Sequence, residues 1–442
     1  GISFNWTGSG HSILVKIGVI GLGYVGLPLV IQFAKSGVSV LGLDIDETKV
    51  ESINAGESYI RHIPSGEIKA LQKDGKIEAS GDFSRVRELD AVLICVPTPL
   101  NPGNEPDLSY VLETGNSIAP HLTAGVVVVL ESTTYPGTTE DELRPILEKG
   151  SRMKAGKDFY LAYSPEREDP GNPQSQVGRV PKVVGGFTPT CCSRAEAVYK
   201  VAVETLVPVS SCRVAEASKL LENVFRGVNI ALVNELKLVL DEMNIDVWEV
   251  IQAASTKPYG FMPFYPGPGL GGHCIPIDPF YLAWKARQSG RETRFIELAG
   301  EINSSMPAHV VNQCAKALGD NTESLTGKRV LVIGLAYKAD VDDCRESPAL
   351  SIMDSLQKRG AHVDYYDPYI PIVPQTRSHA TLAGLESVTW EESCISSYDL
   401  AIIVTAHSRV NWKQLDDWVG RVVDTRNVMA RAGISSQKIC KA

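Results

Sequence analysis

The 442-residue chain lacks any apolar run near the roughly 20 residues that a membrane-spanning helix needs. Its longest apolar runs, Val126–Leu130 and Ala401–Val404, have the length of strands. Residues 1–15 contain no positively charged segment followed by an apolar one, so we expect no signal peptide there. Their Gly and Ser content is typical of a flexible tail. The sequence therefore predicts no membrane partner.

The chain also has no excess of basic residues and no Cys-x-x-Cys pair. The formal net charge of −9 argues against a nucleic-acid partner, although a few placed Lys and Arg residues are enough to bind an anionic substrate. The nine cysteines are odd in number and irregularly spaced, which predicts reduced thiols in the cytoplasm, with no disulfide framework and no metal site. The length and the 43% apolar content indicate a globular protein of two or three domains.

The first half of the chain alternates short apolar runs with helical patterns. Such alternation predicts a doubly wound parallel sheet, which we assign to residues 16–211. The expected strands lie at 16–21, 38–44, 91–96, 126–130, 159–163 and 182–184.

Residues 212–319 have a different pattern. Residues 214–243 carry apolar side chains at helical spacing and no proline, which predicts a helix of about 45 Å. A helix of this length usually joins domains or forms a subunit interface, so we expect a homodimer built on it. A Pro- and Gly-rich loop follows at 257–279, and more helix is expected to about residue 318.

A second, smaller α/β pattern occupies residues 328–442, after a linker at 320–327. Its expected strands are at 328–335, 362–366, 400–404 and 422–424. The first turn, Gly334–Lys338, lacks the second and third glycines of a dinucleotide fingerprint, so we assign it no dinucleotide. The predicted fold class is therefore α/β, with two doubly wound Rossmann-like domains joined by a long central helix.

The glycine motif Gly21-Leu22-Gly23-Tyr24-Val25-Gly26 follows the first expected strand and opens a helical pattern. Gly21 suits the tight turn, Gly23 the approach of a pyrophosphate, and Gly26 the close packing of the helix. Asp44, 18 residues after Gly26, is placed to accept hydrogen bonds from ribose hydroxyls and to repel a 2′-phosphate. The motif predicts NAD as the cofactor. The alternatives are FAD, a nucleotide alone, or a turn that serves only the fold.

Taken together, the motifs resemble those of the UDP-glucose/GDP-mannose dehydrogenase family, and the resemblance runs from Lys16 to about Val428. It rests on several motifs in the same order, namely Gly21–Gly26, Val96-Pro97-Thr98-Pro99, Ser132-Thr133, Ser164-Pro165-Glu166-Arg167, Ala217-Ser218-Lys219 with Asn223, Gly271-Gly272-His273-Cys274 with Asp278, and Lys338 through Arg345-Glu346-Ser347. The resemblance implies an NAD-dependent oxidoreductase that acts on a nucleotide sugar, with a role in polysaccharide biosynthesis.

Some segments point to one branch of this family. Glu57–Ile63 and Thr256-Lys257-Pro258 resemble enzymes acting on UDP-N-acetylhexosamines, and the UDP-N-acetylglucosamine 6-dehydrogenases are nearest in appearance. Two departures from the UDP-glucose dehydrogenases agree with this. Ile277 stands where those enzymes commonly have Lys, and Arg167–Gly171 replaces an apolar stretch. Both departures put glucose in doubt as the sugar.

Cofactor and substrate contacts follow from the same motifs. The residues expected to bind NAD are Gly21, Gly23, Tyr24, Val25, Gly26, Asp44, Pro97, Thr98, Thr133 and Arg345. Those expected to bind the nucleotide sugar are Glu166, Arg167, Lys219, Asn223, Lys257, Phe264, Tyr265, Gly271 and Lys338. Phe264 and Tyr265 are suited to stack on uracil, but aromatic residues at this spacing pack within loops as often.

Oxidation of a primary alcohol to an acid takes two hydride transfers and therefore two NAD⁺. The intermediate aldehyde offers no hydride until a nucleophile adds to it. A cysteine thiolate gives a thiohemiacetal, and the second oxidation then leaves a thioester that water cleaves. Cys274, in a glycine-rich loop, is the predicted nucleophile, whereas the other eight cysteines are expected to be small buried hydrophobes.

The resemblance implies roles for five further catalytic residues. Lys219 and Asn223 lie four apart on one helix face and are expected to stabilise an oxyanion and to bind a water or substrate oxygen. Asp278 handles protons, while Thr133 and Glu166 position the hydrolytic water. Simpler readings are a solvated Lys219, Asp278 as a helix N-cap, and Glu166 paired with Arg167 or Lys182.

The main prediction is oxidation of the C6 alcohol of a UDP-N-acetylhexosamine, first UDP-N-acetylglucosamine, to the uronic acid. Relatives acting on UDP-N-acetylmannosamine, UDP-N-acetylgalactosamine, UDP-glucose or GDP-mannose are the alternatives of the same class. The alternative of another class is a sensor that binds NAD or a nucleotide sugar without catalysis. Such a sensor would not need Cys274, Lys219, Asn223, Asp278 and Glu166 together. A single-step hydroxyacid dehydrogenase needs no cysteine nucleophile.

Overall fold

The structure is a computed structural model that describes residues 15–167, 179–272, 275–319, 324–376 and 378–442. The described chain divides into two compact units. Unit 1 comprises the residues up to Glu222 together with Phe280–Arg291, and unit 2 comprises Asn223–Pro279 and Glu292–Ala442. Within these described residues, no helix is both long and apolar enough to span a membrane.

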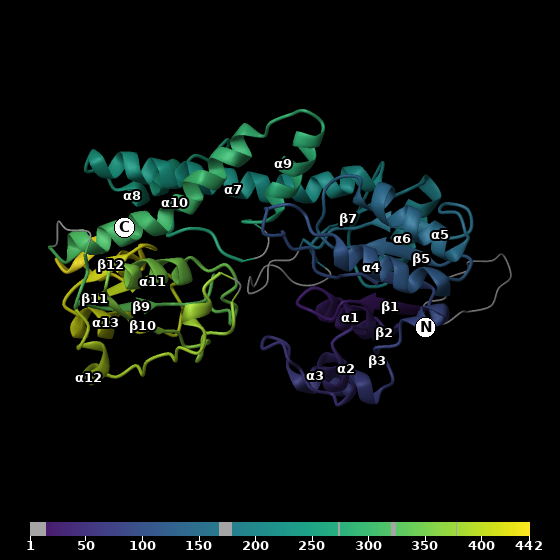
Figure 1. Cartoon of the computed structure of the whole chain (residues 1–442), viewed down its shortest axis with the longest axis horizontal. Helices are drawn as coiled ribbons and strands as arrows, with labels where there is room; N and C mark the ends of the chain where they lie inside the picture. Colours follow the sequence, from purple (N-terminus) through teal and green to yellow (C-terminus); the bar gives the residue numbers. More distant parts are fainter. Residues whose placement is uncertain (1–14, 168–178, 273–274, 320–323, 377) are drawn as a thin grey trace. The chain divides into compact units, whose positions relative to one another are not determined.

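Unit 1 is built on an eight-stranded sheet with helices on its two faces (Figure 1). The strand order is β3-β2-β1-β4-β5-β6-β7-β8, and the order reverses between β1 and β4. The strands are β1 (Lys16–Ile20), β2 (Ser39–Leu43), β3 (Ile77–Ser80), β4 (Ala91–Ile94), β5 (Val127–Leu130), β6 (Tyr160–Tyr163), β7 (Lys182–Gly186) and β8 (Leu206–Val209). The helices are α1 (Gly26–Lys35), α2 (Glu47–Asn54), α3 (Ser65–Lys73), α4 (Ser109–Ile118), α5 (Arg144–Ser151) and α6 (Pro189–Tyr199), with shorter turns η1 (Phe83–Glu88), η2 (Ala119–His121) and η3 (Thr138–Leu143).

The central strands β4 and β5 are apolar throughout and fully buried, as expected for a parallel sheet covered on both faces. One pair departs from the predicted parallel arrangement, because β6 and β7 are antiparallel. No crossover helix of the described residues separates these two strands, and strands joined without such a crossover run antiparallel. The other paired strands of this sheet are parallel.

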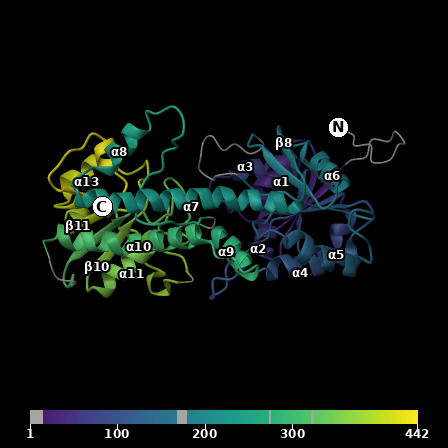
Figure 2. The same ribbon diagram turned by 90° about the horizontal axis from the view of Figure 1, so that it is seen from above.

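The predicted long helix is present as α7 (Cys212–Glu242), which is followed by α8 (Val247–Ala254), α9 (Asp278–Gln288) and α10 (Arg294–Ala317). Helix α7 begins in unit 1 and ends in unit 2. Its second half lies beside α10 in both views (Figure 2), and the Asn234 side chain on α7 donates a 2.9 Å hydrogen bond to Asn303 on α10. The buried amide pair ties these two helices together.

Unit 2 also contains a five-stranded, fully parallel sheet in the order β10-β9-β11-β12-β13. Its strands are β9 (Arg329–Ile333), β10 (His362–Tyr366), β11 (Leu400–Ile403), β12 (Val422–Asp424) and β13 (Ile439–Lys441). Its helices are α11 (Pro348–Lys358), α12 (Glu392–Ile395), α13 (Trp412–Trp418) and α14 (Val428–Arg431), with the short turn η4 (Ala380–Leu382). The fold class is thus the predicted one, with two Rossmann-like sheets and a long helix between them in sequence.

Candidate active site

The glycine motif forms a tight turn between β1 and α1, at the point where the strand order reverses. Gly21 has a left-handed φ of 91°, and a Cβ there would lie 2.7 Å from the Cys95 carbonyl oxygen. A Cβ on Gly26 would lie 1.7 Å from the Gly21 carbonyl oxygen, whereas one on Gly23 would meet nothing within 4 Å. Two glycines therefore serve packing, and the third leaves open space where the fingerprint places a pyrophosphate.

Two further features of the turn fit a dinucleotide. No side chain of the described residues caps the N-terminus of α1, whose first turn carries no acidic residue. Its first N–H groups therefore lack side-chain partners, which suits phosphate oxygens. The buried Asp44 carboxylate at the end of β2 accepts hydrogen bonds from the backbone of Leu22 (2.7 Å) and Asp46 (2.8 Å), which fixes it beside the turn. The residues present fit NAD.

Lys49 is a neighbour of Asp44 that the sequence reasoning missed. Its ammonium nitrogen lies 3.8 Å from an Asp44 carboxylate oxygen. Lys49 lies three residues into α2, and its residue type alone gives no sign of which way the side chain points. Burial, with Asp44 and Asp46 nearby, raises the pKa of Tyr59, whose hydroxyl donates a hydrogen bond to the Leu22 carbonyl.

The structure brings together the loops that follow β4 and β5. The Thr98 hydroxyl donates a 2.6 Å hydrogen bond to the Thr133 carbonyl oxygen, and the Ser132 hydroxyl donates one of 2.6 Å to that of Val96. Both loops leave the carboxyl edge of adjacent parallel strands, which is the edge where open α/β sheets bind ligands. Pro97, Thr98 and Thr133 are therefore held at one edge of this sheet.

Glu166 and Arg167 follow β6 at the same edge. The Arg167 guanidinium pairs with Glu222 of α7 at 2.8 Å and donates to the Pro181 carbonyl. A Glu166 carboxylate oxygen accepts the Arg167 backbone N–H at 2.7 Å. The Arg167 guanidinium therefore forms its ion pair with Glu222. The Arg167 backbone N–H makes the contact with the Glu166 carboxylate.

Beneath these loops lies a buried charged cluster that the sequence reasoning did not identify. The Lys182 ammonium group lies 3.2 Å from a Glu131 carboxylate oxygen, and the Tyr199 hydroxyl donates to the other oxygen. Burial raises the pKa of Glu131, against the effect of Lys182. Burial alone would lower the pKa of Lys182, but Glu131 and Glu166 outweigh it and raise that pKa. The cluster places a positive charge just behind Glu166.

Asn223 and Asp278 are in contact, and Asp278 lies four residues after the predicted nucleophile in the sequence. The Asn223 side-chain amide donates a 2.6 Å hydrogen bond to Asp278, and their exposures are only 3% and 4%. Asp278 is also the first residue of α9, so it lies at a helix start as well as at the site. Cys274 and His273 lie outside the described residues. Lys219, one turn before Asn223 on α7, is 8% exposed and pairs with no carboxylate of the described residues.

The loop leading to Cys274 packs against the turn that carries Lys338. A Cβ on Gly271 or Gly272 would come within 3 Å of Tyr337, and the Gly272 N–H donates to the Arg345 carbonyl at 3.0 Å. Earlier in the loop, the Gly267 N–H donates to the Asn234 side chain at 2.9 Å. Gly271 and Lys338 are thus on adjoining segments of unit 2.

Other predicted substrate and cofactor residues have partners within the chain. Tyr265 stacks on Trp248 at 5.7 Å, Phe264 contacts Phe225 edge to face, and Lys257 lies over Tyr259. Arg345 forms an ion pair with Asp343. A ligand that uses these side chains competes with, or adds to, these contacts.

Arg426 is a second basic residue that the sequence reasoning missed. It follows β12 at the carboxyl edge of the second sheet, and its position after a strand was the available signal. A Cβ on Gly267 would lie 2.6 Å from its guanidinium, and Arg426 Nε donates to the Val404 carbonyl. Burial lowers the pKa of Arg426 to about 10, so it keeps its charge at neutral pH.

Three domain models of one family match the chain in order. The UDP-glucose/GDP-mannose dehydrogenase family's NAD binding domain matches residues 15–203, its central domain 213–305, and its UDP binding domain 331–431.

Two curated relatives have full-length similarity. A UDP-N-acetyl-D-glucosamine 6-dehydrogenase of Pseudomonas aeruginosa is 35% identical over 396 residues, covering 89% of this chain and 91% of its own. A UDP-N-acetyl-D-mannosamine dehydrogenase of Salmonella typhi is 37% identical over 429 residues, covering 93% and 98%.

Two solved structures are also similar. A UDP-D-ManNAc dehydrogenase from Pyrococcus horikoshii has a TM-score of 0.83 at 33% identity, covering 94% of this chain and 96% of its own. A UDP-glucose dehydrogenase from Pyrobaculum islandicum has a TM-score of 0.85 at 26% identity, covering 98% of each chain. The relatives therefore share the chemistry in their names but differ in the sugar.

Proposed function

Because the chain belongs to the UDP-glucose/GDP-mannose dehydrogenase family, whose members are NAD-dependent, we propose that it oxidises C6 of a UDP-N-acetylhexosamine to the carboxylate. UDP-N-acetylglucosamine is the proposed first substrate. The observation that carries the proposal is the buried Asn223–Asp278 pair, because Asp278 stands four residues after Cys274 in the sequence. The two curated relatives named for N-acetylhexosamine substrates, and Ile277 in place of Lys, support the sugar class.

The proposed chemistry places one bond-forming step on Cys274. Bound NAD⁺ supplies the hydride acceptor in both oxidations. In the first oxidation Asp278 receives the alcohol proton, directly or through water held by Asn223. The Cys274 thiolate then adds to the aldehyde carbon, and the carbonyl oxygen becomes the hydroxyl of a thiohemiacetal. Loss of a second hydride and a proton leaves a thioester, and water releases the carboxylate and regenerates the thiol.

Lys219 suits the charge that develops on the substrate oxygen, because a buried ammonium group near an alkoxide acts where little water screens it. Thr133 and Glu166 are proposed to hold the hydrolytic water. The Lys182 ammonium group contributes a positive charge to the surroundings of Glu166.

Binding of the two ligands is proposed to follow the domains. Residues 16–211 bind NAD, through Gly21–Gly26, Asp44, Thr98 and Thr133. Residues 328–442 bind the nucleotide, with Lys338 and Arg426 as donors to the diphosphate, and residues 212–319 carry the cysteine loop. We also propose that the protein works in the cytoplasm, where a reduced thiol at Cys274 is maintained.

A substrate panel tests the function. We expect UDP-N-acetylglucosamine to give two NADH per sugar, while UDP-N-acetylmannosamine, UDP-N-acetylgalactosamine, UDP-glucose and GDP-mannose give lower kcat/KM. The measurement is NADH absorbance at the end point with limiting sugar, together with initial rates. Faster turnover of UDP-N-acetylmannosamine would reassign the epimer. Tight binding of a nucleotide sugar with no NADH formed from any sugar would contradict the proposed activity and favour a sensor.

The apolar stripe on α7 supports a homodimer. Side chains along one line of α7 are at least two-fifths exposed, namely Val214, Leu221, Phe225, Leu232, Leu236 and Val239, and the equally exposed Met243 follows directly after the helix. Their spacings of three, four and seven residues are those of a helix–helix seam. A second copy of the same stripe is a self-complementary partner, as two-fold symmetry requires.

We expect the wild-type protein to elute and scatter light at twice the chain mass. Replacing Leu232 and Leu236 by Glu should shift it to the monomer, because four charges would meet in one symmetric seam. The control is Lys358→Glu, which makes the same change of net charge on the exposed surface of α11. A dimer that survives the double substitution places the interface elsewhere.

A further inference from the structure

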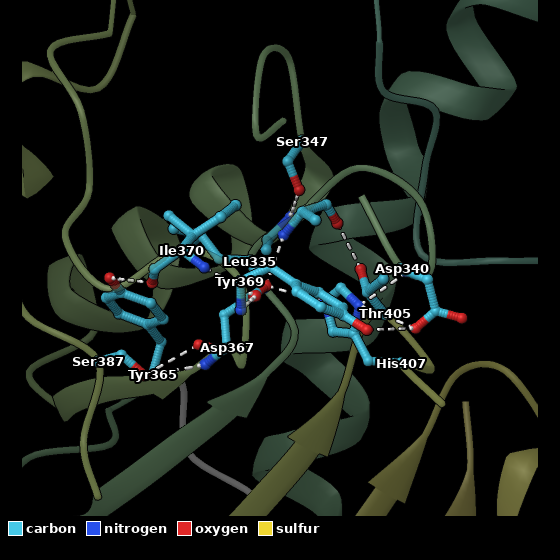
Figure 3. A network of polar contacts seen from close by, with 12 residues as sticks. Leu335, Asp340, Ser347, Tyr365, Asp367, Tyr369, Ile370, Ser387, Thr405 and His407 are labelled. Atoms are coloured by element: carbon cyan, nitrogen blue, oxygen red, sulfur yellow. Dashed lines mark hydrogen bonds and ion pairs between the residues drawn. The ribbon is translucent and has the colours of Figure 1, made fainter. Parts of the chain in front are cut away.

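His407 is a buried histidine whose two ring nitrogens both have partners (Figure 3). It follows β11 at the carboxyl edge of the second sheet. Its Nδ1 accepts the Asp340 backbone N–H at 2.9 Å, and its Nε2 lies 2.9 Å from an Asp367 carboxylate oxygen. Because Nδ1 is an acceptor here, the pattern assigns the single proton of a neutral ring to Nε2, which donates to Asp367.

Asp367 fixes the start of the turn after β9. The carboxylate oxygen that faces His407 also accepts the backbone N–H groups of Leu335 at 2.7 Å and Ala336 at 2.9 Å. Its other oxygen accepts the N–H of Tyr369 at 2.8 Å. Burial opposes its ionisation, but the hydrogen bonds from His407 and the backbone outweigh it and lower the pKa of Asp367. The carboxylate is therefore held ionised beneath the turn.

Asp340 fixes the end of the same turn. It has a left-handed φ of 63°, which is uncommon for a non-glycine residue although Asp adopts it more readily than most. The Asp340 backbone N–H donates to Nδ1 of His407. The Asp340 carboxylate accepts the backbone N–H and the hydroxyl of Ser408 at 2.8 and 2.9 Å. His407 therefore connects the two ends of one turn, residues 335–340.

This turn carries Tyr337 and Lys338. Lys338 is the proposed donor to the substrate diphosphate. Tyr337 packs against Gly271 and Gly272, directly before the segment that contains Cys274. Any shift of the turn moves both side chains, since they are neighbours on a six-residue segment.

We propose that His407 is a positioning residue for nucleotide binding. Through its neutral ring it sets the turn 335–340, and through the turn it sets Lys338. This inference rests on the proposed function for the identity of the bound nucleotide as UDP. It assigns His407 no contact with substrate. It concerns an alignment in which a misplacement of about 1 Å can lower the reaction rate on the order of 100-fold.

The test compares His407→Leu, which removes both hydrogen bonds, with His407→Gln, whose amide presents one donor and one acceptor at similar spacing. We expect His407→Leu to weaken UDP binding, measured by calorimetry, by about 10- to 100-fold. KM for the UDP-sugar should rise in parallel, while KM for NAD stays unchanged. His407→Gln should restore most of the affinity. The matched control is Tyr398→Phe, which removes a part-buried 2.7 Å hydrogen bond to Asp364 in the same domain.

A double-mutant cycle with Lys338→Ala separates positioning from general loss of packing. If His407 acts through Lys338, His407→Leu should weaken UDP binding little further once Lys338 is Ala. Fully additive losses, UDP affinity retained in His407→Leu, or a His407→Gln as weak as the Leu variant would each overturn the proposal. Should His407→Leu fail to fold, His407→Asn, too short to bridge both partners, is expected to show the same loss.

Calorimetry with UDP also keeps this proposal distinct from the proposed function. A wild type that binds UDP but oxidises no sugar would overturn the dehydrogenase proposal and leave the role of His407 to be decided by the binding data. A wild type that does not bind UDP would overturn the role of His407.

Discussion

Replacing Cys274 by Ser is expected to stop net oxidation of the UDP-sugar to the acid, with kcat falling by about 10³-fold or more. The reason is chemical. A serine hydroxyl is rarely ionised at neutral pH, so addition to the aldehyde fails and no second hydride becomes available. A fall of 10³ corresponds to about 4 kcal/mol in the activation free energy. The first oxidation does not need the thiol, so at most one NADH per sugar should form in a single turnover.

The measurement is rapid-mixing NADH absorbance at enzyme concentrations above the substrate, with hydroxylamine added to capture any aldehyde. Cys394→Ser is the matched control, because Cys394 is a part-buried free thiol of the second domain with no role in the proposal. It should retain two NADH per sugar. Full two-step turnover by Cys274→Ser would contradict the thiohemiacetal route, and activity lost equally in both variants would point to a nonspecific effect.

Most strands were predictable because they contain short apolar runs. β10 and β12 lie where the sequence predicted them, although β10 is an edge strand, and β5 lies within one residue of its predicted range. The three strands that the sequence did not reveal lie at sheet edges. β8 contains Pro208, which an edge strand tolerates because one side of its backbone lacks a partner strand. β3 (IEAS) and β13 (ICK) mix polar with apolar residues, so neither forms an apolar run.

Predicting the site depended on whether a residue acts through sequence neighbours or through distant ones. The Gly21–Gly26 turn is local, so its roles were readable from spacing. The Lys182–Glu131 pair joins residues 51 apart, and the His407–Asp367 contact joins residues 40 apart. The order of the strands determines which residues meet, and that order cannot be read from the sequence. The contact of Arg426 with Gly267 also joins residues far apart in the sequence, although the position of Arg426 after a strand was a signal that the sequence offered.

The glycines of the cofactor turn are expected to separate stability from NAD binding. In Gly26→Ala the new methyl carbon would lie 1.7 Å from the Gly21 carbonyl oxygen, so α1 or the turn must shift. Overpacking of this kind costs about 3 kcal/mol, which lowers Tm by roughly 6–12 °C in a domain of this size. Because the N-terminus of α1 moves with the helix, NAD affinity should also fall by at least about 100-fold.

Gly23→Ala is the informative partner, because its methyl group would meet no protein atom within 4 Å. We expect its Tm to equal that of wild type, while NAD affinity, measured by calorimetry or fluorescence, falls because the methyl fills the space left for the pyrophosphate. Gly66→Ala is the control for Ala substitution itself, since it is equally open but lies on α3. If Gly23→Ala binds NAD normally, the pyrophosphate does not approach this glycine. If Gly23→Ala loses stability as Gly26→Ala does, Gly23 serves the packing of the turn rather than the cofactor. Only loss of binding with unchanged stability agrees with a turn whose glycines divide between packing and the cofactor.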